Sequence, residues 1–217
     1  MGDRKIVVAI DGPVASGKGT LSRLLAAYFD FRHLDTGSLY RAAALNLLRR
    51  GDEPGDTAAA VRAAETVANI DLTDIALRDE KIGLLASQIA PIPEVRKTLL
   101  DYQRQFAKDP PDQGRGAVLE GRDITTIVCP DADVKIFVTA TAEVRAERRY
   151  NELKDRGEKV TYEEVLADLL RRDRQDSERA ASPLKLADDA HLLDTSILDI
   201  DTAFEAACEI IRAAARN

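Results

Sequence analysis

The chain has 217 residues, which is enough for one α/β domain with a substantial buried core. Apolar residues make up 45% of the sequence and aromatic residues only 5%, so Leu, Ile, Val and Ala must fill that core. A formal charge of −7 argues against a nucleic-acid or anionic-membrane partner, because both require a basic surface.

Other features of the composition predict a soluble cytoplasmic protein. Cys129 and Cys208 have no paired spacing, which favours reduced thiols buried in the core over a disulfide or a metal site. His33 and His191 are too few and too isolated for a zinc site. No apolar run approaches the roughly 18 residues of a membrane span, and the segment before the first strand does not resemble a signal peptide. We therefore expect no membrane partner.

In the first half of the chain, short apolar strands are followed by helices. The sequence predicts strands at 5–10 and 31–34, and helices at 18–29, 38–50, 57–69, 79–90 and 94–107. Turn residues indicate loops at 51–55 and 108–116. Residues 70–77 predict only a short irregular or extended piece.

The second half continues this alternation. Strands are predicted at 117–120, 134–138 and 191–193, and helices at 141–154, 161–174 and from Asp199 onward. Short β-branched runs such as 134–138 are typical of buried parallel strands. The whole pattern predicts an α/β fold: a parallel sheet with helices on both faces and a ligand crevice at the carboxyl ends of the strands.

The loop after the first strand carries the clearest chemical signal. It consists of Gly12, Pro13, Val14, Ala15, Ser16, Gly17, Lys18, Gly19 and Thr20. A strand, a glycine-rich loop, a lysine and a helix form a P-loop, in which backbone N–H groups and the lysine surround phosphates. Gly19 stands where many P-loops carry the hydroxyl that binds Mg²⁺, and the hydroxyl follows one residue later at Thr20. The loop predicts a nucleoside-triphosphate site.

Polar side chains gather where the other strands end. Asp35, Thr36, Tyr40 and Arg41 follow the second strand, and residues 120–123 end the third. The late segment 145–179, which includes two predicted helices and the charged turn between them, carries a set of arginines, namely Arg145, Arg148, Arg149, Arg156, Arg171, Arg172, Arg174 and Arg179. Arginines on such a hairpin could close as a lid over phosphates, because a guanidinium holds phosphate oxygens with two hydrogen bonds. Phosphoryl transfer needs such positioning and charge neutralisation more than a reactive side chain.

In this order, the motifs resemble those of the bacterial cytidylate (CMP) kinases of the nucleoside-monophosphate kinase family. The resemblance covers nearly the whole chain. It rests on Gly17–Thr20, Asp35–Arg41, Ala86–Ala90 with Val95 and Arg96, Glu120–Asp123, Pro130–Ala132, and the segment from Arg172 to Leu184. It implies a P-loop kinase fold whose substrates are ATP, with Mg²⁺, and CMP or dCMP.

The resemblance also implies roles for individual residues. ATP phosphates would lie on Gly12–Thr20, and the CMP phosphate would meet Tyr40, Arg41 and Arg122. Thr36, Ser87, Arg96 and Asp123 would read the cytosine edge, while Arg172, Asp176 and Arg179 would approach the ribose and the transferring phosphoryl group. Lys18, Arg122, Arg172 and Arg179 are then the expected catalytic residues, with Arg148 and Arg149 as further lid candidates. No protein ligand of the metal is assigned.

For the domain organisation, the resemblance implies one domain, 1–217, and a monomer. Its core would comprise about 1–35, 115–140 and 185–217, its monophosphate-binding region about 36–110, and its short arginine-rich lid about 148–175. The sequence departs from the family in two places. Thr36 stands where many members have Ser, and residues 70–77 are too short for the three-stranded insert usual at that point, so a reduced insert is expected.

Two other functions remain open from the residues alone. One is a P-loop kinase for a different monophosphate or for a metabolite hydroxyl, with Asp35 or Asp123 as the base. The other is a GTP-dependent switch. The sequence has no Asn-Lys-x-Asp segment to read guanine, and its Asp-x-x-Gly sequence at Asp52–Gly55 lies in a turn.

Overall fold

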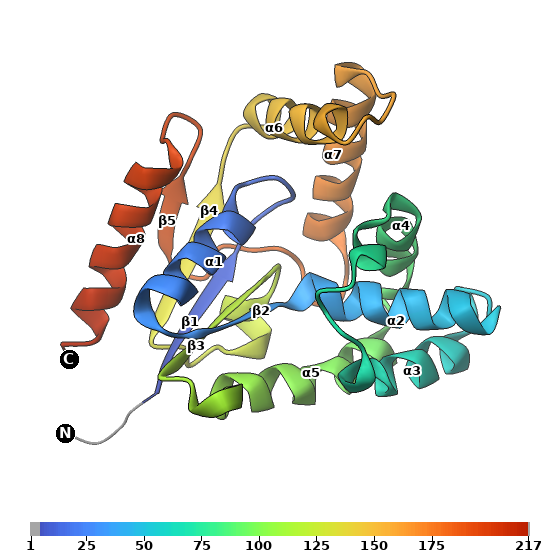
Figure 1. Ribbon diagram of the computed structural model, residues 1–217, viewed down its shortest axis with the longest axis horizontal. Helices are drawn as coiled ribbons and strands as arrows, with labels where there is room; N and C mark the ends of the chain where they lie inside the picture. The colour runs from blue at the N-terminus through green and yellow to red at the C-terminus, as the bar shows by residue number, and fades with distance from the viewer. Residues whose placement is uncertain (1–4, 217) are drawn as a thin grey trace.

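The central sheet contains five parallel strands in the order β2-β3-β1-β4-β5 (Figure 1). The computed structural model describes residues 5–216; residues 1–4 and 217, which the expected domain includes, lie outside this range. The strands are β1 (Ile6–Asp11), β2 (Arg32–Asp35), β3 (Gly116–Gly121), β4 (Val134–Thr139) and β5 (His191–Asp194). Each strand begins and ends within one residue of its predicted bounds. The parallel sheet is confirmed.

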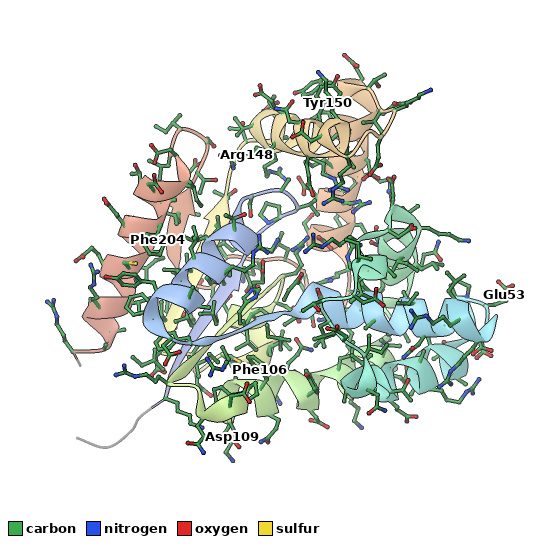
Figure 2. All side chains as sticks on the ribbon, in the orientation of Figure 1. Glu53, Phe106, Asp109, Arg148, Tyr150 and Phe204 are labelled. Carbon is green, nitrogen blue, oxygen red and sulfur yellow. The ribbon has the colours of Figure 1, made fainter. Side chains whose placement is uncertain are left out.

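Helices cover both faces of the sheet, as predicted. Val8 and Ile10 of β1 pack on α1 (Lys18–Phe29) and α8 (Ile200–Ala214), and Ala9 faces the opposite side. Phe204 lies between α8 and α1, where its ring meets Tyr28 edge-on (Figure 2). Alternate β1 side chains therefore belong to two separate apolar clusters, as the period of a strand requires.

A second group of helices packs on the other face and beside it. It consists of α2 (Thr36–Arg50), α3 (Thr57–Glu65), α4 (Glu80–Ile89) and α5 (Pro93–Lys108). Between α3 and α4 the chain forms only two short 3₁₀ turns, η1 (Val67–Asn69) and η2 (Ile75–Arg78), and another, η3 (Pro111–Gln113), precedes β3. The stretch 66–79 thus contains no strand, which agrees with the predicted reduced insert.

The hairpin of α6 (Ala142–Asp155) and α7 (Tyr162–Glu178) extends beyond the sheet on the side of the P-loop (Figure 1). A capping box at Thr161 and Glu164 begins α7, as the sequence predicts. None of the helices in residues 5–216 combines the length and apolarity that a membrane span requires.

Several predicted helix bounds are wrong. α3 ends at Glu65 rather than 69, where η1 takes over. α2 begins at Thr36 instead of 38, because the Asp35 carboxylate accepts from Gly37 N and Ser38 Oγ at 2.9 Å each. α7 continues to Glu178, four residues past its predicted end, where Gln175 and Asp176 bond to other elements. The π-helical turn η4 (Ile124–Val128) is not predicted at all.

The entry to the P-loop tolerates only glycine. Gly12 has φ +157°, and a Cβ there would lie 2.1 Å from the carbonyl oxygen of Val138. We expect Gly12→Ala to lower the free energy of unfolding by about 3 kcal/mol, because neither backbone can retreat without disturbing β1 or β4. Urea denaturation measures this. Gly55→Ala is the matched control, since nothing lies within 4 Å of that position; an equal loss in both variants would contradict the argument.

Candidate active site

The P-loop presents an open helix start to a ligand. Gly17 precedes α1 with φ 87°, and no side chain caps the first turn of the helix. Lys18 Nζ donates to Pro13 O at 3.2 Å, so the lysine folds back along its own loop. Uncapped N–H groups and an ammonium at one point form an anion site. The geometry fits the predicted phosphate loop.

The Lys18 ammonium is weakly stabilised in this setting. Loss of hydration, reinforced by the positive charge of Arg122, lowers the pKa of Lys18 to about 8. The carboxylates of Glu120, Asp35 and Asp176 act in the opposite direction. A bound phosphate would add negative charge and raise the pKa of Lys18 again.

A cavity of about 350 Å³ opens beside the P-loop, between α2, α4, α5, α7 and the end of β3. It is lined by all ten residues predicted to bind the acceptor: Thr36, Tyr40, Arg41, Ser87, Arg96, Arg122, Asp123, Arg172, Asp176 and Arg179. Of the predicted loop residues, Val14, Ala15, Lys18 and Gly19 also line it. The structure thus brings the motifs from distant parts of the sequence into one compartment.

Arginines and carboxylates alternate across this cavity. Arg96 Nη2 pairs with Asp123 Oδ2, and Arg179 lies 3.9 Å from the other oxygen of Asp123. Arg179 is also 3.8 Å from Asp176, whose second oxygen accepts from Arg122 Nε at 2.7 Å. Within the described chain, the buried Arg179 Nη2 has no hydrogen-bond partner. A ligand oxygen would satisfy that donor.

Two of the predicted base-reading residues have hydroxyl protons that are already engaged. Thr36 Oγ1 donates to Glu120 O at 2.7 Å, and Ser87 Oγ donates to Gly83 O at 3.0 Å. Both side chains can still accept a hydrogen bond from a ligand through the remaining lone pairs.

Tyr40 and Arg41 project from the first turns of α2. The Tyr40 ring lies 5.7 Å from the Arg96 guanidinium, and burial raises the pKa of Tyr40 to about 12. Tyr40 therefore remains a hydrogen-bond donor at neutral pH. Arg41 Nη1 donates to Leu77 O at 2.9 Å. Arg172, on α7, pairs with Asp168 at 2.8 Å.

The two further lid candidates do not line the cavity. Arg148, labelled in Figure 2, lies in the middle of α6 and donates to the hydroxyl and carbonyl of Thr195 at 3.0 and 2.7 Å. Arg149 pairs with Glu152 on its own helix at 2.8 Å. Arg145 instead holds the hairpin together, through two bonds to Asp173 at 3.0 and 2.7 Å.

Sequence reasoning missed several residues of the site. Glu120 lines the cavity, and its carboxylate accepts from His33 Nε2 at 2.9 Å, so this histidine is not isolated. Gln175 donates to Ser87 O at 3.1 Å and joins α7 to α4. Ser182 Oγ accepts from Arg96 Nε at 3.2 Å. The strand-end position of Glu120 was a usable signal, whereas nothing in the local sequence marks Gln175 or Ser182.

Both carboxylates considered as bases have other partners. Asp35 caps α2, and Asp123 faces Arg96 and Arg179. Each carboxylate is therefore already engaged, Asp35 as a helix cap and Asp123 as a counter-ion, and neither is left free beside the cavity as a base. The arrangement disfavours a hydroxyl acceptor.

Comparison with known proteins agrees with the geometry. The sequence pattern of the cytidylate kinase family matches residues 8–213. Two curated relatives, both described as "Cytidylate kinase", come from Rhodopseudomonas palustris (strain BisB18) and Xanthobacter autotrophicus (strain ATCC BAA-1158 / Py2). They are 54% and 56% identical over 96% of this chain, and the matches cover 96% and 98% of the relatives.

Among solved structures, an uncharacterized protein from Eubacterium ventriosum ATCC 27560 superposes with a TM-score of 0.55. The identity is 13%, and the match covers 96% of this chain and 99% of the other, so it supports the fold alone. A parallel sheet, a P-loop and an arginine-lined cavity define a P-loop kinase. Within that class, the chain belongs to the cytidylate kinase family.

The lowered pKa of Lys18 predicts a pH dependence of ATP binding. The ammonium binds phosphate and the neutral amine does not, so affinity should fall as the pH rises through about 8. Above that pH, binding should also take up a proton, because phosphate restores the charge on Lys18. Isothermal titration with ATP in two buffers of different ionisation enthalpy, without divalent metal, measures both effects.

Lys18→Arg is the matched control for this experiment. A guanidinium stays charged throughout the range, so the variant should bind more weakly overall but without the change near pH 8. The same pH profile in both proteins would show that another group titrates.

Proposed function

We propose that this chain transfers the γ-phosphoryl group of ATP to CMP or dCMP, giving ADP and CDP or dCDP. The observation that carries the proposal is the Arg96–Asp123 pair, which lies in the same cavity as Lys18 of the P-loop. One end of the cavity suits phosphates and the other presents a donor beside an acceptor, both largely buried.

The Arg96–Asp123 pair suits cytosine chemically. The 4-amino group of cytosine is a donor, which a carboxylate accepts, and its ring nitrogen and carbonyl accept from a guanidinium. A pyrimidine with a carbonyl at position 4 would place an acceptor against Asp123. Two acceptors, the buried carboxylate and the carbonyl oxygen, would then face each other without a proton between them, which disfavours UMP.

The remaining cationic side chains suit the transfer step. Arg41 and Arg122, with Tyr40 as a neutral donor, would hold the acceptor phosphate, and Arg172 and Arg179 would neutralise charge on the moving phosphoryl group. Since a phosphate oxygen is already a nucleophile, the site needs no general base. This agrees with the pairing of Asp35 and Asp123 to other groups.

Mg²⁺ fits the residues beside the P-loop. Residues 5–216 hold no group of three or more His, Cys, Asp or Glu that could bind a metal by themselves. Both carboxylate oxygens of Glu120 lie 3.3 Å from the point where a side chain at Gly19 would begin. A single carboxylate together with phosphates and waters is the usual shell of Mg²⁺, so Glu120 would hold it. Bound there, the ion would neutralise phosphate charge.

The division of the chain is part of the same proposal. The core would consist of about 1–35, 115–140 and 185–217, the monophosphate-binding region of about 36–110, and the lid of about 148–175. Arg145 connects the lid to the P-loop, because it donates to Val14 O of the loop at 3.2 Å as well as to Asp173 of α7. This contact supports a lid whose position depends on the P-loop. Lid closure would exclude water from the γ-phosphate.

We also propose a monomer that works in the cytoplasm without a nucleic-acid partner. The cavity is enclosed by elements of one chain, so a second copy is not needed to complete it. Cys129 and Cys208 are both free, which suits a reducing compartment. Cys129 is only half-buried, contrary to the expectation that both thiols lie inside the core.

A panel of nucleoside monophosphates tests the activity. With ATP and Mg²⁺, release of ADP should be fastest with CMP and dCMP, and kcat/KM for UMP should be at least about tenfold lower. AMP and GMP are expected to react more slowly than CMP. Equal rates with all four bases would contradict the base-reading role of Arg96 and Asp123.

Arg179→Ala tests the transfer step. Removal of this guanidinium should lower kcat by about 10³, because its charge is expected to stabilise the transition state. Arg171→Ala is the matched control: Arg171 lies on α7, which Arg179 directly follows, pairs with Asp168, and does not line the cavity. Thermal denaturation should show that both variants remain folded. A rate near that of the wild type for Arg179→Ala would remove this residue from the site.

A further inference from the structure

Asp11 is a buried carboxylate that the proposed function leaves without a role. It is the last residue of β1, directly before the P-loop, and its side chain is fully buried. Its two oxygens accept three hydrogen bonds: from Ile124 N at 2.9 Å, Thr125 N at 2.8 Å and Thr125 Oγ1 at 2.7 Å. All three donors belong to the turn that follows Arg122 and Asp123.

The contacts of Asp11 fix both ends of a very short span. In the parallel register of β1 and β3, Asp11 stands opposite Gly121, the last residue of β3. The Asp11 carboxylate then holds the backbone of Ile124. Only Arg122 and Asp123 lie between these two anchors. Asp11 therefore holds their backbone at a fixed position relative to the P-loop, which begins at the next residue.

The turn held by Asp11 is unusual. In η4, Val128 N donates to Asp123 O at 3.1 Å and Cys129 N donates to Ile124 O at 2.8 Å, which is the i to i+5 pattern of a π-helix. Such turns are rare and occur frequently at functional sites. On the far side of η4, Arg104 of α5 donates to Ile127 O and Val128 O at 2.9 and 3.1 Å. The turn is thus fastened to the core at one end and to α5 at the other.

We propose that Asp11 is a positioning residue for the acceptor, which sets Arg122 and Asp123 at a defined place relative to the P-loop. The inference rests on the proposed function, because it assumes that Asp123 meets the acceptor base. A carboxylate is required since three donors converge on it. The amide of asparagine accepts through one oxygen only, and in either orientation its NH₂ group would oppose a backbone N–H, that of Ile124 or that of Thr125.

The electrostatics of Asp11 agree with this role. Burial raises the pKa of the Asp11 carboxyl, and the nearby charge of Asp123 acts in the same direction, whereas the three donors lower it. The three donors thus offset only part of the desolvation cost that burial places on the Asp11 carboxylate. If Asp11 served only to fill space in the core, an apolar side chain of similar size would do so without this desolvation cost.

Asp11→Asn tests the proposal through a comparison of the two substrates. Isothermal titration and steady-state kinetics should show Kd and KM for CMP rising about tenfold, as loss of well-placed buried hydrogen bonds predicts. The preference for CMP over UMP should narrow, because Asp123 is displaced. Kd for ATP should stay within about twofold, and circular dichroism should show a folded protein.

Thr125 provides a second, milder pair of variants. Thr125→Val keeps the shape of the side chain but removes one of the three donors, and should weaken CMP binding about threefold. Thr125→Ser keeps the hydroxyl and should bind CMP as tightly as the wild type. Asp133→Asn is the matched control. The Asp133 carboxylate accepts from Val7 N at 2.8 Å, and Val7 lies on β1, like Asp11, but at the end of the strand away from the cavity. This variant should change the affinity for neither CMP nor ATP.

The outcomes separate the inference from the proposed function. If the wild-type protein neither binds nor phosphorylates CMP, the proposed function fails and the inference fails with it. If the wild type is active but Asp11→Asn and Thr125→Val leave CMP binding unchanged, only the inference is overturned. Equal weakening of ATP and CMP would also overturn it, since Asp11 would then act as a general structural residue.

Discussion

Mutual neutralisation of five charged side chains makes the acceptor cavity possible. Arg96, Asp123, Arg179, Asp176 and Arg122 alternate in sign across it, and each has an opposite charge beside it. Without the carboxylates, three guanidinium groups in a half-buried cavity would repel one another and lose hydration. The pairs also orient each guanidinium before a ligand arrives, which reduces the ordering that binding must impose. The site is preorganised by its own counter-charges.

The N-terminal ends of α1 and α2 differ in whether a side chain satisfies their free N–H groups. A carboxylate occupies the start of α2, where Asp35 accepts from Gly37 N, while no side chain caps α1. The two helix starts differ because the residue before α1 is Gly17, which adopts φ 87° and has no side chain that could cap the helix. One helix start is used for the fold and the other is left for an anion.

The arginine-rich hairpin has both structural and site-facing members. Arg145 joins α6, α7 and the P-loop, and Arg148 bonds to Thr195, which in turn donates to Ser16 O at 3.0 Å. Of the arginines within the predicted lid, Arg172 alone lines the cavity. Arginines of similar sequence context thus differ in role according to the partner that the fold places within reach.

Sequence reasoning recovered the architecture because it rests on local physics. The alternation of short apolar strands with helices determines a parallel sheet, and a glycine-rich loop between a strand and a lysine determines a phosphate site. Both signals lie within a few neighbouring residues. The identities of the cavity residues came from ordered motifs, whose spacing reflects the family more than any contact visible in one sequence.

Tertiary structure decided the contacts between distant segments. The π-helical turn η4 depends on Asp11 and Arg104, which lie far from it in the sequence, so no local pattern predicts it. The extra turn of α7, the link from Gln175 to Ser87 and the role of Ser182 arise in the same way. The sequence by itself determined the sheet and the P-loop, because each depends on short-range periodicity and backbone freedom. Only the folded chain decided which charges meet, because a salt bridge depends on distance in space.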